Sequence, residues 1–460
     1  MTNPRRRPSP ARRGRTGRAA TAAVGVAGLL AAAGCSGGAA PGTAATGAAT
    51  AVPAALSPSP TLSPTGFPSV SPTLSPSAPG STSASASAPG TVAELTPAVT
   101  ARLDAAVQRV LNQASVPGVM VALTTPQDSY IRAFGVSDKI AGIPMVTGLN
   151  MRIGSETKTF TVTGVLRLVD QNRVGLDDPI SKYVPGVPGG DAITLRQLAD
   201  MRSGLFPYTS DQDFVQALLA DPHREFTPQQ LLSYAFAHPA NFAPGTEFEY
   251  SNTNTVLLGL VVEKVSGQPL GTFLKQQVFE PADLGRTVFP VDASFPQPHA
   301  RGYTNQTPSG AIADATDWNP SWAWAAGAMI SDLSDLQKWA KVLATGTLLK
   351  PATQAERLQT PPSGDPGLGY GLGVFVNHGW IGHNGSLPGY QCVAVYLPSA
   401  QATLVVLLNT DIPYQGSAPS TLFAQAITEI VSPGNVYSLP VAPSSGSPSA
   451  PASSPALAET

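Results

Sequence analysis

Two stretches that are poor in large side chains limit where this chain can build a core. Residues 36–90 consist almost wholly of Ala, Ser, Thr, Pro and Gly, and residues 442–460 have the same composition. Such segments cannot bury enough apolar surface to offset the entropy lost on folding. We therefore expect a disordered linker at residues 35–91, one folded domain at 92–439 and a disordered tail at 440–460.

The first 34 residues have the plan of an export signal. Seven arginines and no acidic residue occupy residues 1–18, and an apolar run follows from Ala19 to Gly34. The run is short for a permanent membrane span and ends in small residues that suit a peptidase. We predict that residues 1–34 are a signal peptide, read by the ordinary secretory route rather than the twin-arginine route.

The apolar run stops at Cys35, one of the two cysteines. The segment from Leu29 to Cys35 resembles a bacterial lipobox, in which the cysteine becomes the lipidated first residue of the mature protein. This predicts an extracytoplasmic lipoprotein on a flexible tether, and cleavage without lipidation would instead give a secreted protein. The other cysteine, Cys392, lies in an apolar stretch and is expected to be buried.

The charge balance argues against a nucleic-acid partner. The chain has 27 basic and 29 acidic residues, and loss of the leader would leave 20 basic residues against the same 29. An acidic mature protein lacks the basic surface that binding to phosphates requires.

Helical and strand patterns alternate through the predicted domain. Apolar spacing predicts helices over residues 96–114, 155–172, 256–265 and 421–431, and strands over residues 118–124, 130–135, 370–376, 391–396 and 403–409. Because strands from both ends of the domain would share one sheet, we expect a mixed α/β (α+β) fold. Its antiparallel sheet would be flanked by helices, with the long middle of the chain as a mostly helical part.

Ser155 and Lys158 stand three residues apart where a loop enters a predicted helix. Residues at this spacing face the same side of a helix, so the lysine amine can reach the serine hydroxyl. A lysine with a lowered pKa can activate a serine, and the helix N-terminus favours developing negative charge. The same spacing also occurs by chance in an exposed, capped helix.

Two further segments carry polar groups at element boundaries. Tyr250 and Asn252 follow a Pro-Gly turn and precede a predicted helix; a tyrosine can relay a proton if its pKa is lowered, and an asparagine can hold a substrate amide. His383 begins the run His383–Ser386, in which Gly385 would let a substrate approach and the Ser386 amide could stabilise an oxyanion. Taken alone, Tyr250 is better explained as a packed tyrosine and His383 as a structural histidine.

The order of these segments along the chain is more specific evidence than any one segment. The chain resembles the family of class C beta-lactamases and D-alanyl-D-alanine carboxypeptidases, which are beta-lactamase-related serine hydrolases, and especially its secreted Streptomyces-type carboxypeptidases. The matching segments, in chain order, are 152–158, 198–209, Tyr250–Asn254, Ser321-Trp322, Ala326–Ala328, Gly369–Gly373 and His383–Gly385.

The resemblance implies a beta-lactamase/transpeptidase-like fold and a role for each matched residue. Ser155 would form the acyl-enzyme, Lys158 and Tyr250 would move protons, and His383 would orient the cluster. Substrate would be bound by Asn252, Thr209, Trp322, Asn384, Gly385 and Ser386, with the amides of Ser155 and Ser386 as the oxyanion hole. The implied substrates are D-alanyl peptides of the peptidoglycan type or beta-lactams, and no cofactor or metal ion is implied.

Two departures leave the substrate open. Asn384 stands where threonine is usual, and Phe375 stands where the carboxypeptidase-like relatives have an arginine near the substrate carboxylate. Arg152 or Asn384 would have to replace that arginine. An esterase, a class C-type beta-lactamase, or a catalytically silent penicillin-binding sensor module therefore remain alternatives. Signatures of an alpha/beta-hydrolase elbow or a zinc enzyme do not occur in the sequence.

Overall fold

The computed structural model describes residues 91–361 and 367–439. The predicted signal peptide, Cys35, nearly all of the predicted linker and the tail lie outside the described residues. Within the described ranges, no helix is both long enough and apolar enough to cross a membrane.

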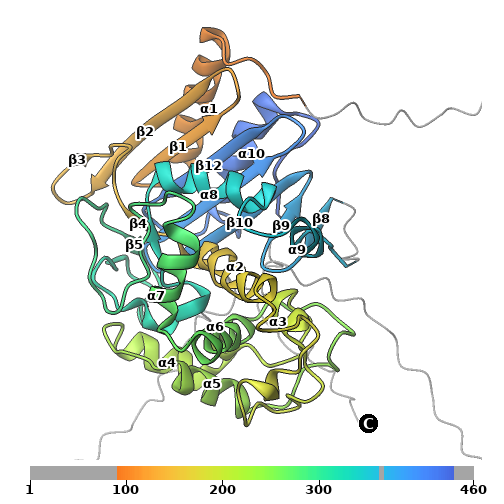
Figure 1. The fold of residues 1–460 in the computed structure, drawn as a ribbon. Coiled ribbons are helices and arrows are strands. Elements are labelled where there is room, and N and C mark those ends of the chain that lie inside the picture. The colour runs from red at the N-terminus through yellow and green to blue at the C-terminus, as the bar shows by residue number, and fades with distance from the viewer. Residues whose placement is uncertain (1–90, 362–366, 440–460) are drawn as a thin grey trace, which may run out of the picture. The chain divides into compact units, whose positions relative to one another are not determined.

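An eight-stranded antiparallel sheet forms the centre of the described structure, in the order β3-β2-β1-β12-β11-β10-β9-β8 (Figure 1). Strands from the beginning and the end of the domain meet where β1 pairs with β12. The strands are β1 (Gly118–Thr124), β2 (Ser129–Asp138), β3 (Ile143–Pro144), β8 (Leu368–Tyr370), β9 (Phe375–Asn377), β10 (Trp380–Leu387), β11 (Tyr390–Leu397) and β12 (Ala402–Leu408).

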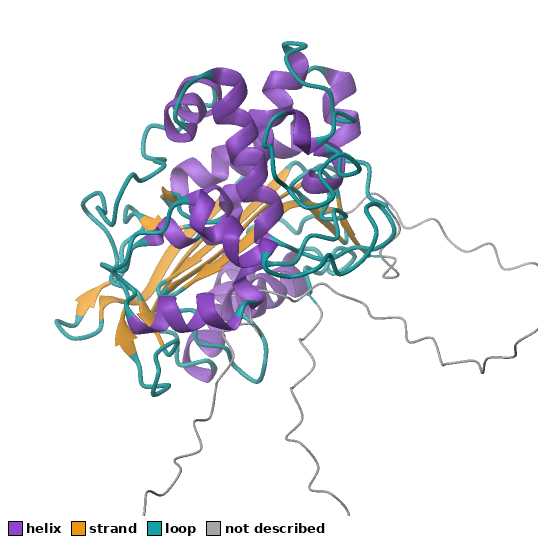
Figure 2. Cartoon of the chain, turned by 90° about the horizontal axis from the view of Figure 1, so that it is seen from below, coloured by secondary structure: helices purple, strands orange, loops and turns teal. Residues whose placement is uncertain are grey.

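Two terminal helices cover one face of this sheet. α1 (Pro97–Gln113) and α10 (Pro419–Val431) pack together, and their apolar residues form one core with alternate side chains of the central strands. Thr96 caps α1 by accepting from the Val99 amide, which explains why the helix begins there. Figure 2 shows the strands with helices on both sides.

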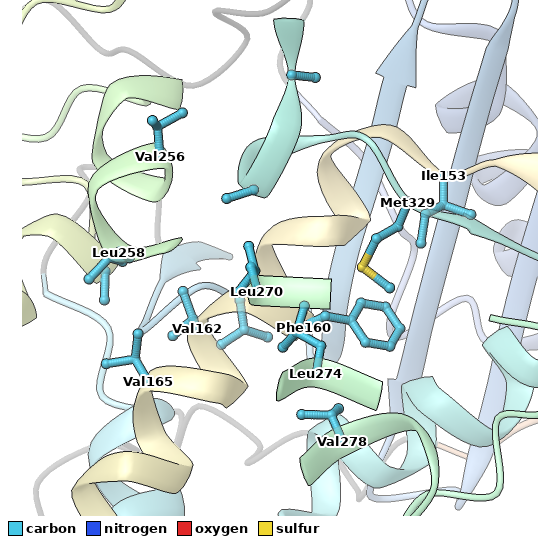
Figure 3. Close-up of a cluster of buried hydrophobic side chains, with 14 of the residues drawn as sticks. Ile153, Phe160, Val162, Val165, Val256, Leu258, Leu270, Leu274, Val278 and Met329 are labelled. Atoms are coloured by element: carbon cyan, nitrogen blue, oxygen red, sulfur yellow. The ribbon is translucent and has the colours of Figure 1, made fainter. Parts of the chain in front are cut away.

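The other face carries α8 (Leu333–Thr345) and, beyond it, α2 (Thr157–Asp170), the first helix after the turn at Ser155. α2 is surrounded by apolar side chains: Figure 3 shows Val162 and Val165 facing residues of neighbouring helices, including Leu270 and Leu274. The remaining helices are α3 (Leu195–Ala199), α4 (Gln212–Ala220), α5 (Pro228–Phe236), α6 (Asn252–Ser266), α7 (Leu270–Leu274) and α9 (Pro351–Arg357). Burial on all sides fixes the position of the α2 N-terminus.

The expected mixed α/β architecture is confirmed, with one wrong element. Residues 370–376, predicted as one strand, are the inner parts of β8 and β9, joined by a turn. Gly371 lies so close to Arg357 that an added Cβ would be 2.1 Å from its carbonyl oxygen, and Gly373 has a φ of +67°. Because the segment is largely apolar, its periodicity alone predicts a continuous strand and does not indicate the turn.

Two small ladders complete the frame. β4 (Met151–Arg152) pairs with β7 (Ile330–Ser331), and β5 (Tyr303–Thr304) pairs with β6 (Ala313–Asp314). The first of these ladders leads directly into the segment that carries Ser155.

Candidate active site

The β4–β7 ladder delivers Ser155 to the N-terminal end of α2. Beyond β4, the Ile153 amide donates to the Met329 carbonyl over 3.0 Å. Gly154 then turns the chain with a φ of +51°, a conformation that favours glycine. A single 3-10 turn, Gly154–Glu156, runs straight into α2. The nucleophile candidate is therefore held by a ladder before it and a buried helix after it.

Lys158 points back from the first turn of α2 to Ser155. Its Nζ lies 2.9 Å from the Ser155 Oγ and donates to the Ala326 carbonyl over 2.8 Å. The lysine is 0% exposed, and burial lowers its pKa well below the usual value. A neutral amine that donates to Ala326 keeps its lone pair for the Ser155 O–H. The pair thus has the geometry of a nucleophile with its general base, and burial favours the neutral amine that this role needs.

Tyr250 lies against the same lysine, with the Lys158 Nζ 4.9 Å from the ring centre. Within the described part of the chain its enclosed hydroxyl has no hydrogen-bond partner of normal geometry. Burial raises the pKa of Tyr250, and the neighbouring Ser155 hydroxyl offsets only part of this effect. The lowered pKa that a tyrosine base would need is not found here, so Tyr250 is suited to donate or relay a proton.

His383, on β10, is buried beside these groups. Its Nδ1 is hydrogen-bonded to the Asn384 carbonyl, which only accepts, so Nδ1 carries the ring proton. Nε2 then accepts from the Tyr370 hydroxyl over 3.3 Å. Burial lowers the pKa of His383 to about 3. His383 is therefore a neutral group at physiological pH.

The strand register explains how the Ser386 amide becomes available. The β9–β10 hairpin closes with a two-residue turn, so Trp380 and Gly382 direct their backbone groups towards β9. Ser386 has the same parity along β10, but β9 ends opposite Gly382. The Ser386 amide faces Gly154 instead: a Cβ on Gly154 would lie 2.6 Å from that nitrogen. The amides of Ser155 and Ser386 are thus placed on neighbouring segments, as an oxyanion hole requires.

Replacing Gly154 by alanine is expected to damage this arrangement. The new methyl group would press on the Ser386 backbone, and alanine disfavours the positive φ. We expect kcat to fall by about 100-fold, the loss typical when one oxyanion donor is displaced. Kinetics on the soluble variant would measure it, and Gly285→Ala, where an added Cβ meets nothing within 4 Å, is the matched control. An unchanged kcat would contradict the role given to Ser386.

The other candidate binding residues are only partly gathered at this cluster. Asn252, in the first turn of α6, donates from Nδ2 to the Thr209 Oγ1 over 3.4 Å, so these two are brought together. Asn384 and Ser386 are half-buried on β10. Because Gly385 has no side chain, β10 can lie against the backbone of Ile153; an added Cβ would lie 1.9 Å from the Ile153 carbonyl oxygen.

Trp322 belongs to the core of the helical part. It is 5% exposed, its ring contacts Phe214 at 6.3 Å between centroids, and its carbonyl accepts from the Tyr208 hydroxyl over 2.7 Å. These are the contacts of a structural tryptophan, and its predicted place in the cleft stays a prediction.

Phe375 fills the space beside the catalytic candidates with an apolar ring. It is 6% exposed, its centroid lies 4.7 Å from that of His383, and it stacks on Tyr250 at 6.4 Å. Arg152 is committed elsewhere: its Nη2 donates to the carbonyls of Ala293, Thr316 and Trp318, and its guanidinium lies 4.7 Å from the Phe295 ring centre. Arg152 therefore holds the segments around residues 293–318 and does not replace the missing arginine.

Two participants had no role in the sequence interpretation. The Ala326 carbonyl orients the Lys158 amine, and the Tyr370 hydroxyl binds His383. Both lie in segments that matched the family pattern, but a backbone carbonyl and a tyrosine between glycines give no chemical signal of their own.

A family model and several known proteins match this chain. The Beta-lactamase family model matches residues 103–426. Protein flp of Staphylococcus aureus (strain MRSA252) is 24% identical over 327 residues, which cover 68% of this chain and 63% of the relative. The putative penicillin-binding protein PbpX of Bacillus subtilis (strain 168) is 25% identical over 281 residues, which cover 60% of this chain and 66% of the relative. The chain thus spans just under two thirds of each of these relatives.

Solved structures match over a larger share of their own length. A D-stereospecific amidohydrolase from Streptomyces sp. is 34% identical with a TM-score of 0.62, covering 67% of this chain and 94% of the other. A D-amino acid amidase from Ochrobactrum anthropi SV3 is 27% identical with a TM-score of 0.62, covering 73% and 96%. The family model spans more than half of the chain and contains Ser155, Lys158, Tyr250 and His383. The chain belongs to the beta-lactamase family of serine hydrolases.

Proposed function

We propose that this protein hydrolyses amides of D-configured amino acids through an acyl-enzyme on Ser155. The observation that carries the proposal is the contact between the buried Lys158 amine, whose pKa burial lowers, and the Ser155 hydroxyl, next to the Ser386 amide. Ser155 would lose its proton to Lys158 and bond to the substrate carbonyl. The leaving amine would depart with a proton relayed by Lys158 and Tyr250, and water would then release the acid and restore Ser155.

Phe375 and two structural neighbours support the choice of an amide over a peptide with a free carboxylate. The Streptomyces and Ochrobactrum enzymes carry the titles D-stereospecific amidohydrolase and D-amino acid amidase. Beside His383 and Tyr250 this chain has an apolar ring and not a cation. A carboxylate placed there would lose its hydration without gaining an ion pair, whereas a neutral amide would not.

Release of ammonia from D-phenylalanine amide and L-phenylalanine amide by the purified protein tests the proposal. We expect the D enantiomer to be hydrolysed at least about 100-fold faster, a preference of about 2.7 kcal/mol in the transition state. Equal rates for the two enantiomers, or no turnover of either by folded protein, would overturn it. A small ester assayed in parallel separates an amidase from an esterase.

A second candidate is a D-alanyl-D-alanine carboxypeptidase that beta-lactams acylate. It is supported by the order of the three motifs and by the similarity to a putative penicillin-binding protein. Fluorescent penicillin that labels Ser155, with slow release, would support this activity; rapid release would point to a beta-lactamase. Absence of any acyl-enzyme by mass spectrometry would favour a silent sensor module.

Replacing Phe375 by arginine distinguishes the two substrate classes. The new guanidinium would lie beside His383 and Tyr250 and could pair with a substrate carboxylate. We expect D-alanine release from a D-Ala-D-Ala peptide to rise by about tenfold, with hydrolysis of D-phenylalanine amide falling. The two activities are measured on the same preparation, with Phe375→Leu as the uncharged control. A rise of similar size in the leucine variant would contradict the charge argument.

We also propose that the enzyme works outside the cytoplasmic membrane, held by a lipid on Cys35. The arginine-rich leader, the apolar run and the lipobox-like segment support this location. Labelling with radioactive palmitate, lost in Cys35→Ser, would test the anchor. A cell-bound protein without label would contradict lipidation.

A further inference from the structure

Within residues 91–361 and 367–439, Tyr370 supplies the one hydroxyl that is hydrogen-bonded to His383, and the reaction proposed above gives this hydroxyl no role. It ends β8, is 4% exposed, and its ring meets the Phe375 ring edge-on at 4.7 Å between centroids. Packing therefore fixes the ring and, with it, the position of the hydroxyl oxygen. A tyrosine packed this firmly against a site histidine can control which hydrogen bonds that histidine forms.

The hydrogen-bonding capacity of His383 is fully used. Nδ1–H donates to the Asn384 carbonyl, and the Nε2 lone pair accepts from the Tyr370 O–H. A neutral imidazole has one donor and one acceptor nitrogen, so no further bond remains in the ring plane. With Tyr370 in place, His383 can neither take a proton from a neighbour nor give one up without first breaking a bond.

The groups that face His383 make this restriction consequential. Lys158 approaches from α2, Tyr250 from the segment before α6 at 6.0 Å between ring centroids, and Tyr370 from β8. The fourth neighbour, Phe375 on β9, carries no ionisable group. A free Nε2 would thus compete for the same proton that must pass between Ser155, Lys158 and the leaving group.

We propose that Tyr370 is a positioning residue that occupies the Nε2 lone pair of His383 and so keeps the imidazole out of the proton path between Ser155 and Lys158. In the described part of the chain the Tyr370 hydroxyl is hydrogen-bonded to His383 and not to Ser155 or Lys158, so this hydroxyl acts through His383. The expected effect on kcat rests on the proposed function, whereas the hydrogen bond between Tyr370 and His383 exists in the resting protein. The hydrogen bond and the effect on kcat are therefore tested separately.

The resting protein is tested by long-range proton–nitrogen NMR of the histidine rings, of which the chain has five. His383→Gln identifies the His383 signals by their disappearance. We expect a neutral ring with the proton on Nδ1 in the wild type, and in Tyr370→Phe a shift of the Nε2 resonance and a higher pKa of His383, because the bond to the neutral lone pair is lost. A wild-type ring protonated on Nε2, or an unmoved Nε2 resonance in the variant, would overturn the proposal.

Kinetics test the effect of Tyr370 on catalysis. Tyr370→Phe keeps the ring and its packing, so we expect an unchanged KM and a kcat lower by about tenfold, the factor that corresponds to about 1.4 kcal/mol. Tyr130→Phe, which removes a hydroxyl bonded to Asp104, is the matched control and should keep full activity. If Tyr370→Phe changes the Nε2 resonance but leaves kcat intact, the positioning role is wrong. If the wild type hydrolyses no amide or ester while the NMR result holds, the proposed function fails and the contact stands.

Discussion

Replacement of Ser155 by alanine is expected to abolish acyl-enzyme formation and to lower kcat by about 10⁴-fold or more. Removing a nucleophile leaves only binding and oxyanion stabilisation, which sustain a small residual rate. The fold should survive, because the side chain is small and its hydroxyl interacts with the site residues Lys158 and Tyr250. Mass spectrometry after incubation with substrate or penicillin, together with steady-state turnover, measures the loss.

The control for this variant is Ser334→Ala, which removes an exposed hydroxyl from the first turn of α8. It should acylate like the wild type. Ser155→Ala that still gains the mass of an acyl group would show that another residue is the nucleophile, and the site described here would then be wrong.

The sequence is informative where one short segment determines its own structure. Thr96 and Pro97 mark the start of α1 because a cap and a proline at the first helical position act locally. Ser155 and Lys158 behave in the same way, since one turn of helix is enough to bring them together. The predicted position of Tyr250 just before α6 is likewise a local signal, and it is confirmed.

Contacts between distant segments account for what the sequence could not give. The Lys158 amine bonds to a carbonyl 168 positions along the chain, and any residue type would supply that carbonyl. Arg152 is a similar case. Its positive charge made it a candidate for substrate binding, but its side chain donates hydrogen bonds to three backbone carbonyls. Residue type identifies a reactive group, and packing decides whether it is free to react.

Electrostatics adds a second kind of information that residue type lacks. Tyr250 and Lys158 are both candidates for proton transfer, and burial shifts their pKa values in opposite directions. It raises the pKa of the phenol and lowers that of the ammonium, and in both cases the neutral form is favoured. Burial therefore favours an amine that can act as a base and a phenol that keeps its proton.

Replacement of Lys158 by alanine is accordingly expected to lower the acylation rate at pH 7 by about 10³-fold, within the range that a positioned base contributes. In the wild type, the rate should fall as the pH drops through the lowered pKa of Lys158, because the protonated amine cannot accept the Ser155 proton. The alanine variant should lack this limb and respond only to hydroxide. Lys158→Arg is the matched control, since a guanidinium restores a long hydrogen-bond donor at this position but stays protonated; it should be as slow as alanine. An acylation rate in Lys158→Ala that equals the wild type, or an arginine variant that retains activity, would remove Lys158 as the base and leave Tyr250 to take that role against the effect of its own burial.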